Sequence, residues 1–290
     1  MSKAGFIAVV GRPNAGKSAF INSLIQEKLN MVSHKQNATR RRSQNIVHHD
    51  DAQMIFVDTP GIHQKEKLLN QFMLEEALKA LNDCDISLFL SPISDGMGHY
   101  KDFLKLNKNK PHIVLLTKRD LYSKEQILQT MVKFAAVGND FLALIPYSMK
   151  KPKDKEALFK AIYKVLPSHP FYFDEEIIST QSVKDICEDF VLEAIFEKVS
   201  DEIPYVTDVT IRQFDEKEIV HIHADIIVEK QSQKIVIIGQ QGSSIKRIGQ
   251  YAREQIEELM QKKVALHLQV VVKKGWSKNK ELLKEQGYEI

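Results

Sequence analysis

A glycine-rich segment near the N-terminus has the composition and spacing of a phosphate-binding loop. It matches the pattern G-x-x-x-x-G-K-[ST] and consists of Gly11, Arg12, Pro13, Asn14, Ala15, Gly16, Lys17 and Ser18. The glycines allow the backbone to curl so that successive N–H groups point at phosphate oxygens, and a helix that starts here adds the positive end of its dipole. In such loops the lysine contacts the β- and γ-phosphates and the hydroxyl binds Mg²⁺. We therefore expect Lys17 to be catalytic and Ser18 to be a metal ligand.

A second group of residues is suited to the metal and to the γ-phosphate. A short apolar segment ends in Asp58, Thr59, Pro60 and Gly61. A carboxylate at the carboxyl end of a strand can hold Mg²⁺ through water, and a glycine N–H can contact the γ-phosphate. Residues 34–42 are polar and basic, which favours a segment that becomes ordered when a nucleotide is bound. We expect Ser18, Thr39 and Asp58 to bind the metal, and Thr39 and Gly61 to take part in catalysis.

A third pair of motifs predicts which base is bound. Two apolar runs are followed by Thr117, Lys118, Arg119 and Asp120, and by Ser148, Met149 and Lys150. The Asp120 carboxylate can accept from both the ring N–H and the exocyclic amine of guanine, whereas adenine has an acceptor at that edge. Lys118 would lay its alkyl stem along the base plane, and residues 148–150 would contact the base through main-chain N–H groups. Asp120 therefore favours GTP over ATP.

Residues 1 to about 166 alternate short apolar runs with longer segments of helical periodicity. The runs are unbroken, as is typical of buried parallel strands, and cover 6–10, 55–57, 86–90, 113–116 and 142–146. The helical segments cover 17–26, 69–81, 99–107, 124–136 and 154–165. This alternation predicts a doubly wound, mostly parallel α/β sheet, which binds its ligands at the carboxyl ends of the strands.

The pattern changes after two closely spaced prolines, Pro167 and Pro170, which favour a linker. We expect a nucleotide-binding domain over residues 1–170, a linker over 171–182 and a second domain over 183–290. The expected elements of the second domain are a helix over 183–200, strands over 206–214 and 219–229, a short helix, a glycine-rich turn, a helix over 244–260 and a strand over 264–273. Their order predicts a smaller α+β domain.

The glycine-rich turn of the second domain predicts contact with a nucleic acid. It contains G-x-x-G between two apolar segments that can form helices. Such a turn lets the nucleic-acid backbone approach closely, and flanking isoleucines can line a groove for unstacked bases. The expected RNA-binding residues are Ile238, Gly239, Gln240, Gln241, Gly242, Ser243, Ile245, Lys246 and Arg247. A groove for unstacked bases favours single-stranded RNA over a duplex. We also expect no DNA partner.

The composition predicts a folded protein of the cytoplasm. Of the 290 residues 43% are hydrophobic and 27% charged, and the sequence contains neither an apolar run of membrane-spanning length nor a signal-peptide pattern. Cys84 and Cys187 lie far apart and are expected to be thiols of the core. The net charge is +3, and residues 230–290 carry 12 Lys and Arg against 6 Asp and Glu. This imbalance suggests a polyanionic partner for the C-terminal part.

The phosphate loop, Thr39, the Asp58–Gly61 motif and the Thr117–Asp120 motif occur in an order that resembles the translation-factor class of GTPases and, more closely, the Era family. The second domain resembles the type II KH domain of Era proteins, including Gly275-Trp276-Ser277 after its last strand. The resemblance implies a Mg²⁺-dependent GTPase that binds GTP and GDP. It also implies binding to the 3′ region of small-subunit ribosomal RNA, a role in assembly or maturation of the 30S subunit, and peripheral attachment to the cytoplasmic side of the membrane. We expect a monomer.

Several positions bear on how well the chain would bind and hydrolyse GTP. The family usually has Asn in place of Thr117 and Ala in place of Met149, so we expect weaker nucleotide affinity. Ile62 stands where Ras-like proteins have a glutamine that positions water, so we expect slow intrinsic hydrolysis. In related GTPases with an apolar residue there, an asparagine at the position of Asn14 helps to hold K⁺, which implies a catalytic role for Asn14. The alternative is an RNA-binding adaptor that binds GTP and barely hydrolyses it.

Overall fold

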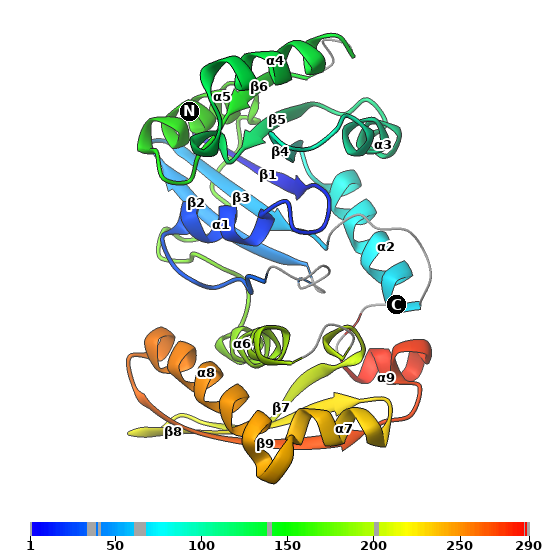
Figure 1. Ribbon diagram of the computed structural model, residues 1–290. Coiled ribbons are helices and arrows are strands. Elements are labelled where there is room, and N and C mark those ends of the chain that lie inside the picture. Colours follow the sequence, from blue (N-terminus) through cyan, green and yellow to red (C-terminus); the bar gives the residue numbers. More distant parts are fainter. Residues whose placement is uncertain are drawn as a thin grey trace. The chain divides into compact units, whose positions relative to one another are not determined.

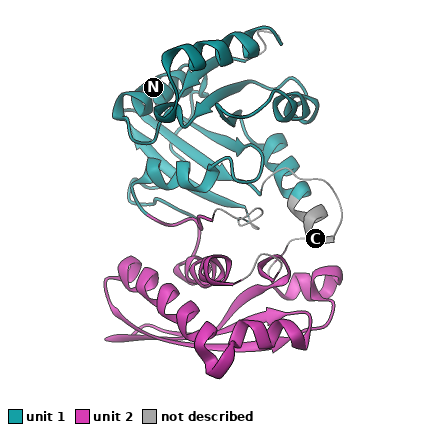
Figure 2. Cartoon of the chain, viewed as in Figure 1, with its two compact units in different colours: residues 1–27, 39–64, 73–180 teal, residues 28–38, 65–72, 181–290 magenta. Residues whose placement is uncertain are grey.

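The computed structural model describes residues 2–33, 39, 42–60, 68–137, 141–199, 203–286 and 288. The chain divides into two compact units (Figure 2). The first contains most of the chain up to Thr180, and the second contains the chain from Gln181 on together with two short segments, Lys28–Ala38 and Lys65–Phe72. The boundary between Thr180 and Gln181 falls within the expected linker, residues 171–182. The domain bounds 1–170 and 183–290 stay a proposal.

The first unit is built on a six-stranded sheet with the order β2-β3-β1-β4-β5-β6 (Figure 1). β2 is antiparallel to β3, and all other neighbours are parallel. The strands are β1 (Lys3–Val10), β2 (Ser43–His49), β3 (Ala52–Asp58), β4 (Ile86–Pro92), β5 (His112–Thr117) and β6 (Ala143–Pro146). The helices are α1 (Lys17–Ile25), α2 (Leu68–Asp83), α3 (Gly98–Asn107), α4 (Lys124–Ala135) and α5 (Pro152–Val165). The predicted fold class is confirmed.

Apolar side chains cover both faces of this sheet, as the unbroken apolar strands predict. Ile7 and Val9 of β1 belong to a core cluster that contains residues of α1 and α5. Ala8 and Val10 belong to a second cluster, which contains residues of α2, α3 and α4. The alternation along β1 therefore places α1 and α5 on one face and the other three helices on the opposite face (Figure 1).

The carboxyl ends of the parallel strands lie along one edge of the sheet. Val9 near the end of β1 pairs with Asp58, the last residue of β3. Pro92 and Thr117, the last residues of β4 and β5, pair with each other. The loops that carry the predicted nucleotide motifs therefore leave the sheet next to one another.

The edge strand β2 was not among the predicted strands, because Ser43, Gln44 and Asn45 at its start are polar. It pairs with β3 on one side. Residues of the expected linker also bond to it: Ile46 N donates to the Ile178 oxygen at 2.9 Å, and Thr180 N donates to the Gln44 oxygen at 3.1 Å. These bonds satisfy backbone groups that an open sheet edge would expose.

The second unit has a three-stranded sheet with the order β7-β8-β9. β8 is antiparallel to β7 and parallel to β9. The elements are α6 (Val183–Lys198), β7 (Asp208–Asp215), β8 (Ile219–Val228), α7 (Gln231–Ile238), α8 (Ser243–Met260), β9 (Lys263–Val272) and α9 (Lys280–Glu285). Val220 and Ile222 of β8 are buried, whereas His221 between them is exposed, so the helices cover one face. The predicted order is confirmed, and α9 is an additional helix.

The described part of the chain also contains short 3₁₀ helices and two buried cysteine thiols. The 3₁₀ helices are Arg119–Leu121, Pro204–Val206, Gln240–Gly242 and Trp276–Lys278. Cys84 and Cys187 are buried and unpaired, which confirms the prediction of core thiols, and burial raises the pKa of each to about 12. Among the described residues, no helix has both the length and the apolar character that crossing a membrane requires.

Candidate nucleotide and nucleic-acid sites

The phosphate loop connects β1 to α1 and has a tightly curled backbone. Asn14 has a φ of 61° and Gly16 a φ of 93°. A Cβ atom on Gly11 would lie 2.8 Å from the carbonyl oxygen of Leu90, so the close approach requires glycine. α1 begins at Lys17 with no capping side chain and no acidic residue in its first turn. The N–H groups at the start of α1 are therefore left for an anion.

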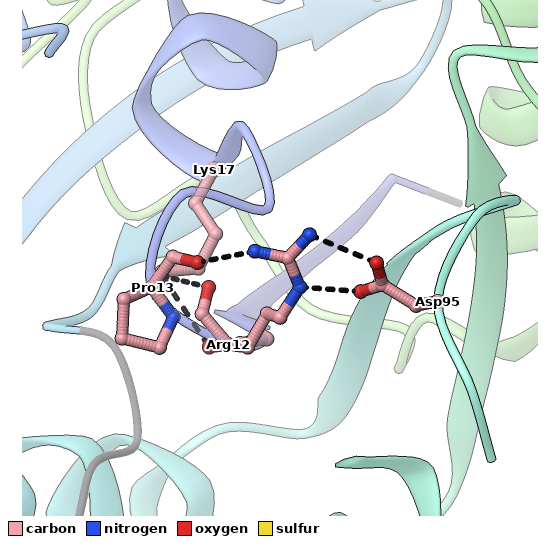
Figure 3. Close-up of polar contacts among 5 residues, drawn as sticks. Arg12, Pro13, Lys17 and Asp95 are labelled. Atoms are coloured by element: carbon pink, nitrogen blue, oxygen red, sulfur yellow. Dashed lines mark hydrogen bonds and ion pairs between the residues drawn. The ribbon is translucent and has the colours of Figure 1, made fainter. Parts of the chain in front are cut away.

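Arg12 fixes the phosphate loop to the loop after β4. Figure 3 shows its guanidinium between Asp95 and the Pro13 carbonyl. Arg12 Nε and Nη2 donate to the two Asp95 carboxylate oxygens at 2.6 and 2.8 Å, and Nη1 donates to the Pro13 oxygen at 2.9 Å. The hydrogen bond with Asp95 raises the pKa of Arg12 above its ordinary value, although desolvation opposes the change. This ion pair is bidentate and thus fixes the orientation of the loop as well as its position.

Lys17 lies in the curl of the phosphate loop with its side chain buried. Its Nζ is 3.4 Å from the carbonyl oxygens of Gly11 and Arg12. Burial lowers the pKa of Lys17, and the nearby Asp58 carboxylate opposes that change. The ammonium group is therefore held by weak bonds beside the N–H groups of the loop, and phosphate oxygens could replace those bonds.

Ser18, Thr39 and Asp58, the three predicted metal ligands, lie together. Ser18 Oγ donates to Asp58 Oδ2 at 2.8 Å and lies 2.9 Å from Thr39 Oγ1. Asp58 is completely buried, and among the described residues its Oδ1 has no hydrogen-bond partner. Burial raises the pKa of Asp58, opposed first by the charge of Lys17. A buried, unpartnered carboxylate oxygen beside two hydroxyl groups is an oxygen donor set that fits Mg²⁺ or its bound water.

The residues after Asp58 connect the metal site to β1. Thr59 is buried, and its Oγ1 donates to the Val9 carbonyl oxygen at 2.8 Å. Pro60 is buried as well. Gly61 and Ile62, predicted to face the γ-phosphate, lie outside the described residues. The side chain of Thr59 thus positions the start of this motif against the strand that carries the phosphate loop.

All the predicted base-binding residues except Arg119 line a pocket of about 240 Å³, and the Arg119 side chain pairs with Asp154 instead. Ser148 Oγ donates to Asp120 Oδ1 at 2.8 Å, and Lys150 Nζ lies 3.5 Å from Asp120 Oδ2. The hydrogen bond from Ser148 lowers the pKa of Asp120, which keeps this carboxylate ionised and able to accept hydrogen bonds. The lining residues are Ala15, Gly16, Phe20, Thr117, Lys118, Asp120, Leu121, Tyr147, Ser148, Met149 and Lys150.

Thr117 and Met149, the two positions at which the resemblance implies a departure from the family, have different surroundings in this pocket. Thr117 is buried, and its Oγ1 has no hydrogen-bond partner among the described residues. Met149 is 45% exposed. Lys118 between β5 and the following 3₁₀ turn has a φ of 61°, a conformation that is uncommon for a residue with a side chain.

The structure adds two carboxylates that the motifs did not predict. Asp95 pairs with Arg12, as described above, and Asp154 in the first turn of α5 pairs with Arg119. Asp95 follows the carboxyl end of β4, where sheets of this kind bind ligands, and that position could have identified it. Asp154 follows Pro152 at a helix start, a position that favours an acidic residue. In both cases the partner lies far away in the sequence.

The G-x-x-G turn joins α7 to α8. Gly239 and Gly242 have φ values of 71° and 76°, and Gln241 between them has a φ of 49°. A Cβ atom on Gly239 would lie 2.7 Å from the Cβ of Ser244, so this tight turn requires glycine. α8 begins at Ser243 with no capping side chain and no acidic residue in its first turn. The start of α8 can therefore receive a phosphate group.

A groove of about 450 Å³ lies between α8 and β9. Two of the predicted RNA-binding residues, Ile245 and Lys246, line this groove. Arg247 is exposed but does not line it, and neither does Ile238, the last residue of α7. Further lining residues, which were not predicted, are Gly249, Gln250, Arg253, Val264, Ala265, Leu266, His267 and Leu268. Helical spacing could have identified Arg253, because residues seven positions apart, such as Lys246 and Arg253, share a helix face.

Comparison with known proteins identifies the family. A family model described as 50S ribosome-binding GTPase matches residues 6–118, and one described as KH domain matches residues 202–277. The GTPase Era of Campylobacter lari is 49% identical over 288 residues, which cover 99% of both chains. The chain belongs to the Era family of GTPases. The GTPase Era of Campylobacter concisus is 46% identical over 284 residues and covers 98% of both chains.

Two solved Era structures match over nearly the full length. The structure of Era in complex with MgGDPNP and nucleotides 1506–1542 of 16S ribosomal RNA has a TM-score of 0.95 and 29% identity, and covers 100% of both chains. The structure of a variant of Aquifex aeolicus Era bound to GDP.AlF4⁻ has a TM-score of 0.94 and 29% identity, and covers 99% of this chain and 100% of that one. The second unit therefore contains the KH domain of an Era protein.

Membership of the Era family confirms the resemblance inferred from the sequence. It makes the chain a GTPase, so the alternative of an adaptor that barely hydrolyses GTP is not favoured. Those predicted site residues that the structure describes lie in two groups, one around the phosphate loop of the first unit and one around the G-x-x-G turn of the KH domain. The role of each residue in binding or catalysis remains a prediction.

Proposed function

We propose that the chain is a GTP- and Mg²⁺-dependent switch that binds the 3′ region of small-subunit ribosomal RNA and assists assembly or maturation of the 30S subunit. The observation that carries this proposal is that Lys28 and Val32, which precede Thr39 in the sequence, bond within the second unit. Lys28 and Val32 belong to the second unit, where Lys28 Nζ and Val32 N donate to the Glu193 carboxylate at 2.7 and 3.0 Å. Thr39 follows a few residues later in the sequence and lies beside Ser18 among the predicted metal ligands of the first unit. In the sequence, only a few residues thus separate a contact of the second unit from the predicted metal ligand Thr39.

The nucleotide is bound, in this proposal, by groups of the first unit. Residues 11–18 bind the phosphates through backbone N–H groups and Lys17, residues 58–62 meet the γ-phosphate, and Asp120 binds guanine between Lys118 and residues 148–150. Ser18, Thr39 and Asp58 hold Mg²⁺, which supplies positive charge that neutralises the phosphate oxygens during hydrolysis. The MgGDPNP bound in a solved relative supports this assignment.

We also propose that the bound nucleotide controls RNA binding by ordering two segments of the chain. GTP orders the Thr39 segment and residues 58–61, which changes how the KH domain presents its groove, and hydrolysis reverses the change. Hydrolysis is slow because Ile62 cannot orient water, and Asn14 contributes by helping to hold K⁺. Equal hydrolysis rates in sodium and potassium salts of the same ionic strength would contradict this role of Asn14.

The KH groove is proposed to bind single-stranded RNA. Gly239 and Gly242 allow the RNA backbone to approach, Ile245 contacts unstacked bases, and Lys246 and Arg247 neutralise phosphates. The 16S ribosomal RNA fragment bound by a solved relative supports this choice of ligand. We further propose that the chain acts as a monomer in the cytoplasm. Its peripheral attachment to the membrane is a proposal that depends on the family resemblance.

Equilibrium RNA binding by the full chain tests the proposal. A labelled single-stranded RNA from the 3′ end of small-subunit ribosomal RNA is titrated with the chain bound to a GTP analogue, bound to GDP, and without nucleotide. We expect the tightest binding with the GTP analogue, and weak binding of a duplex of the same sequence. A Lys246→Ala/Arg247→Ala variant should weaken RNA binding and its dependence on salt. Equal RNA affinity in all three states would contradict the switch.

A further inference from the structure

A buried carboxylate beside the base pocket, that of Asp154, connects two of the loops that form the pocket. Asp154 lies in the first turn of α5 and is 6% exposed. Its two oxygens accept from Arg119 Nε and Nη2, each at 2.5 Å. Oδ2 also accepts from Ser148 N at 2.9 Å. The carboxylate therefore joins the loop after β5, which carries Arg119, to the loop after β6, which carries Ser148.

Ser148 extends this connection to the base-reading residue. While its N–H group bonds to Asp154, its hydroxyl group donates to Asp120 Oδ1 at 2.8 Å. Asp154 thus fixes the backbone of Ser148, and the side chain of Ser148 orients the Asp120 carboxylate. Both hydrogen bonds involve an ionised acceptor, which makes them stronger and more directional than bonds between neutral groups.

The loop after β5 depends on this support. Lys118 has a φ of 61°, a conformation that persists only where the surrounding structure holds it. Thr117 Oγ1, at the beginning of the loop, has no hydrogen-bond partner among the described residues. Arg119 N donates to the Tyr147 oxygen at 3.3 Å, and the Arg119 side chain makes the bidentate bond to Asp154. The side-chain bonds that hold Arg119 in this loop therefore come from α5.

We propose that Asp154 is a positioning residue for guanine specificity, which acts through Arg119 and Ser148 on Asp120. This inference depends on the proposed role of Asp120 in binding guanine. Guanine presents two donors to that carboxylate, whereas hypoxanthine lacks the exocyclic amine and presents one. Only an aligned carboxylate can accept both hydrogen bonds. The preference for GDP over inosine diphosphate (IDP) therefore measures the alignment of Asp120.

The test is equilibrium binding of GDP and IDP to the full chain and to variants. Asp154→Ala removes both contacts of the carboxylate, whereas Asp154→Asn keeps one acceptor oxygen. Arg119→Met removes the other half of the ion pair and leaves the bond from Ser148 N in place. Glu156→Gln is the matched control, because it removes a carboxylate of the same helix that is 54% exposed and does not line the base pocket.

We expect the unaltered chain to bind GDP at least about tenfold more tightly than IDP, the equivalent of one hydrogen bond to a charged group. Asp154→Ala should reduce this ratio by at least about fivefold, because Asp120 then loses its alignment. Asp154→Asn and Arg119→Met should reduce it by smaller factors, and they provide the test if the alanine variant does not fold. Glu156→Gln should leave the ratio unchanged.

A purely structural role of Asp154 would weaken GDP and IDP equally. An unchanged ratio in the Asp154 and Arg119 variants would therefore overturn the proposal. If the unaltered chain bound GDP and IDP equally, the proposed role of Asp120 would be wrong, and the inference about Asp154 would be overturned with it. The two outcomes can be told apart, because an error about Asp154 shows only in the variants, whereas an error about Asp120 already shows in the unaltered chain.

Discussion

The hydroxyl oxygens of Ser18 and Thr39 lie 2.9 Å apart, although 21 positions separate the two residues in the sequence. Ser18 belongs to the first turn of α1, and Thr39 precedes β2. Both hydroxyl groups lie near the buried Asp58 carboxylate, with Ser18 Oγ at 2.8 Å and Thr39 Oγ1 at 3.5 Å from its Oδ2. A ligand that engages Ser18, Thr39 and Asp58 therefore acts on three segments of the chain at once.

Removal of the Thr39 hydroxyl should distinguish GTP from GDP. The variant Thr39→Val keeps the shape of the side chain, and we expect it to bind a Mg²⁺-bound GTP analogue about tenfold more weakly, with little change for GDP, because one oxygen ligand is lost. The measurement is the Kd of each nucleotide with and without Mg²⁺. Thr130→Val on the exposed surface of α4 is the control. An equal loss for GDP and the GTP analogue would contradict the metal-binding role of Thr39.

The buried Glu193 carboxylate should be required for communication between nucleotide and RNA. It accepts from Lys28 Nζ, Val32 N and Tyr251 Oη within the second unit. We expect Glu193→Gln to reduce the tightening of RNA binding by a GTP analogue, because the segment that leads to Thr39 loses its charged anchor. RNA affinity without nucleotide should hardly change. Glu254→Gln on exposed α8 surface is the control, and unchanged tightening in Glu193→Gln would count against this anchor.

The ion pair between Arg12 and Asp95 should stabilise the phosphate loop. Each single variant, Arg12→Met or Asp95→Leu, leaves a partly buried charge without its partner and should cost about 1–3 kcal/mol of unfolding free energy. The double variant should cost less than the sum of the two, because neither charge remains. Urea unfolding of the four proteins measures this coupling, and GDP binding should weaken in parallel. Strictly additive losses would show that the two side chains act independently.

An asparagine at position 117, the residue that the family resemblance implies there, should improve nucleotide binding. Thr117 Oγ1 is buried without a hydrogen-bond partner among the described residues, and a hydroxyl cannot offer both an amide donor and an amide acceptor. We expect Thr117→Asn to lower the Kd for GDP, provided that thermal unfolding shows an intact fold. Thr117→Val, which has nearly the same shape, is the matched comparison. A Kd for GDP that is no lower in Thr117→Asn than in the unaltered chain would refute the predicted cost of this departure.

The folded state should lose stability in alkaline solution. Burial raises the pKa of the Cys84 and Cys187 thiols from 9.0 to about 12, so the unfolded chain releases these protons at lower pH than the folded chain. The unfolding free energy should therefore decrease as pH rises from 9 towards 12, by up to about 1.4 kcal/mol per thiol for each pH unit. Urea unfolding between about pH 8 and 10.5 measures this slope. A Cys84→Ala/Cys187→Ala variant should show a shallower decrease, and an identical slope would contradict the assignment.

Much of the sheet could be predicted because buried parallel strands are unbroken apolar runs. The segment 86–90 is an example, and it became the core of β4. The polar segment 43–49 was not predicted, because an antiparallel edge strand covered by other chain segments needs no such run. α9 was also missed, because a helix of six residues is too short to show a clear helical periodicity. The one local sign of this helix is Asn279, whose side chain caps its start.

The site could be predicted where its residues are neighbours in the sequence. The phosphate loop and the Thr117–Asp120 motif are local patterns with fixed spacing. Asp95 and Asp154 were missed because their partners Arg12 and Arg119 lie 83 and 35 positions away, so that folding alone brings each pair together. Local sequence therefore predicts the groups that touch the nucleotide better than the residues that position those groups.

The central claim is that the nucleotide and RNA sites are energetically coupled, and thermodynamic linkage offers its most direct test. If a GTP analogue tightens RNA binding by some factor, RNA must tighten binding of that analogue by the same factor. The measurement is the Kd of a fluorescent GTP analogue for the full chain, with and without saturating single-stranded RNA from the 3′ end of small-subunit ribosomal RNA. We predict a lower Kd in the presence of RNA and no such change for GDP. The same Kd for the analogue with and without RNA would contradict the account.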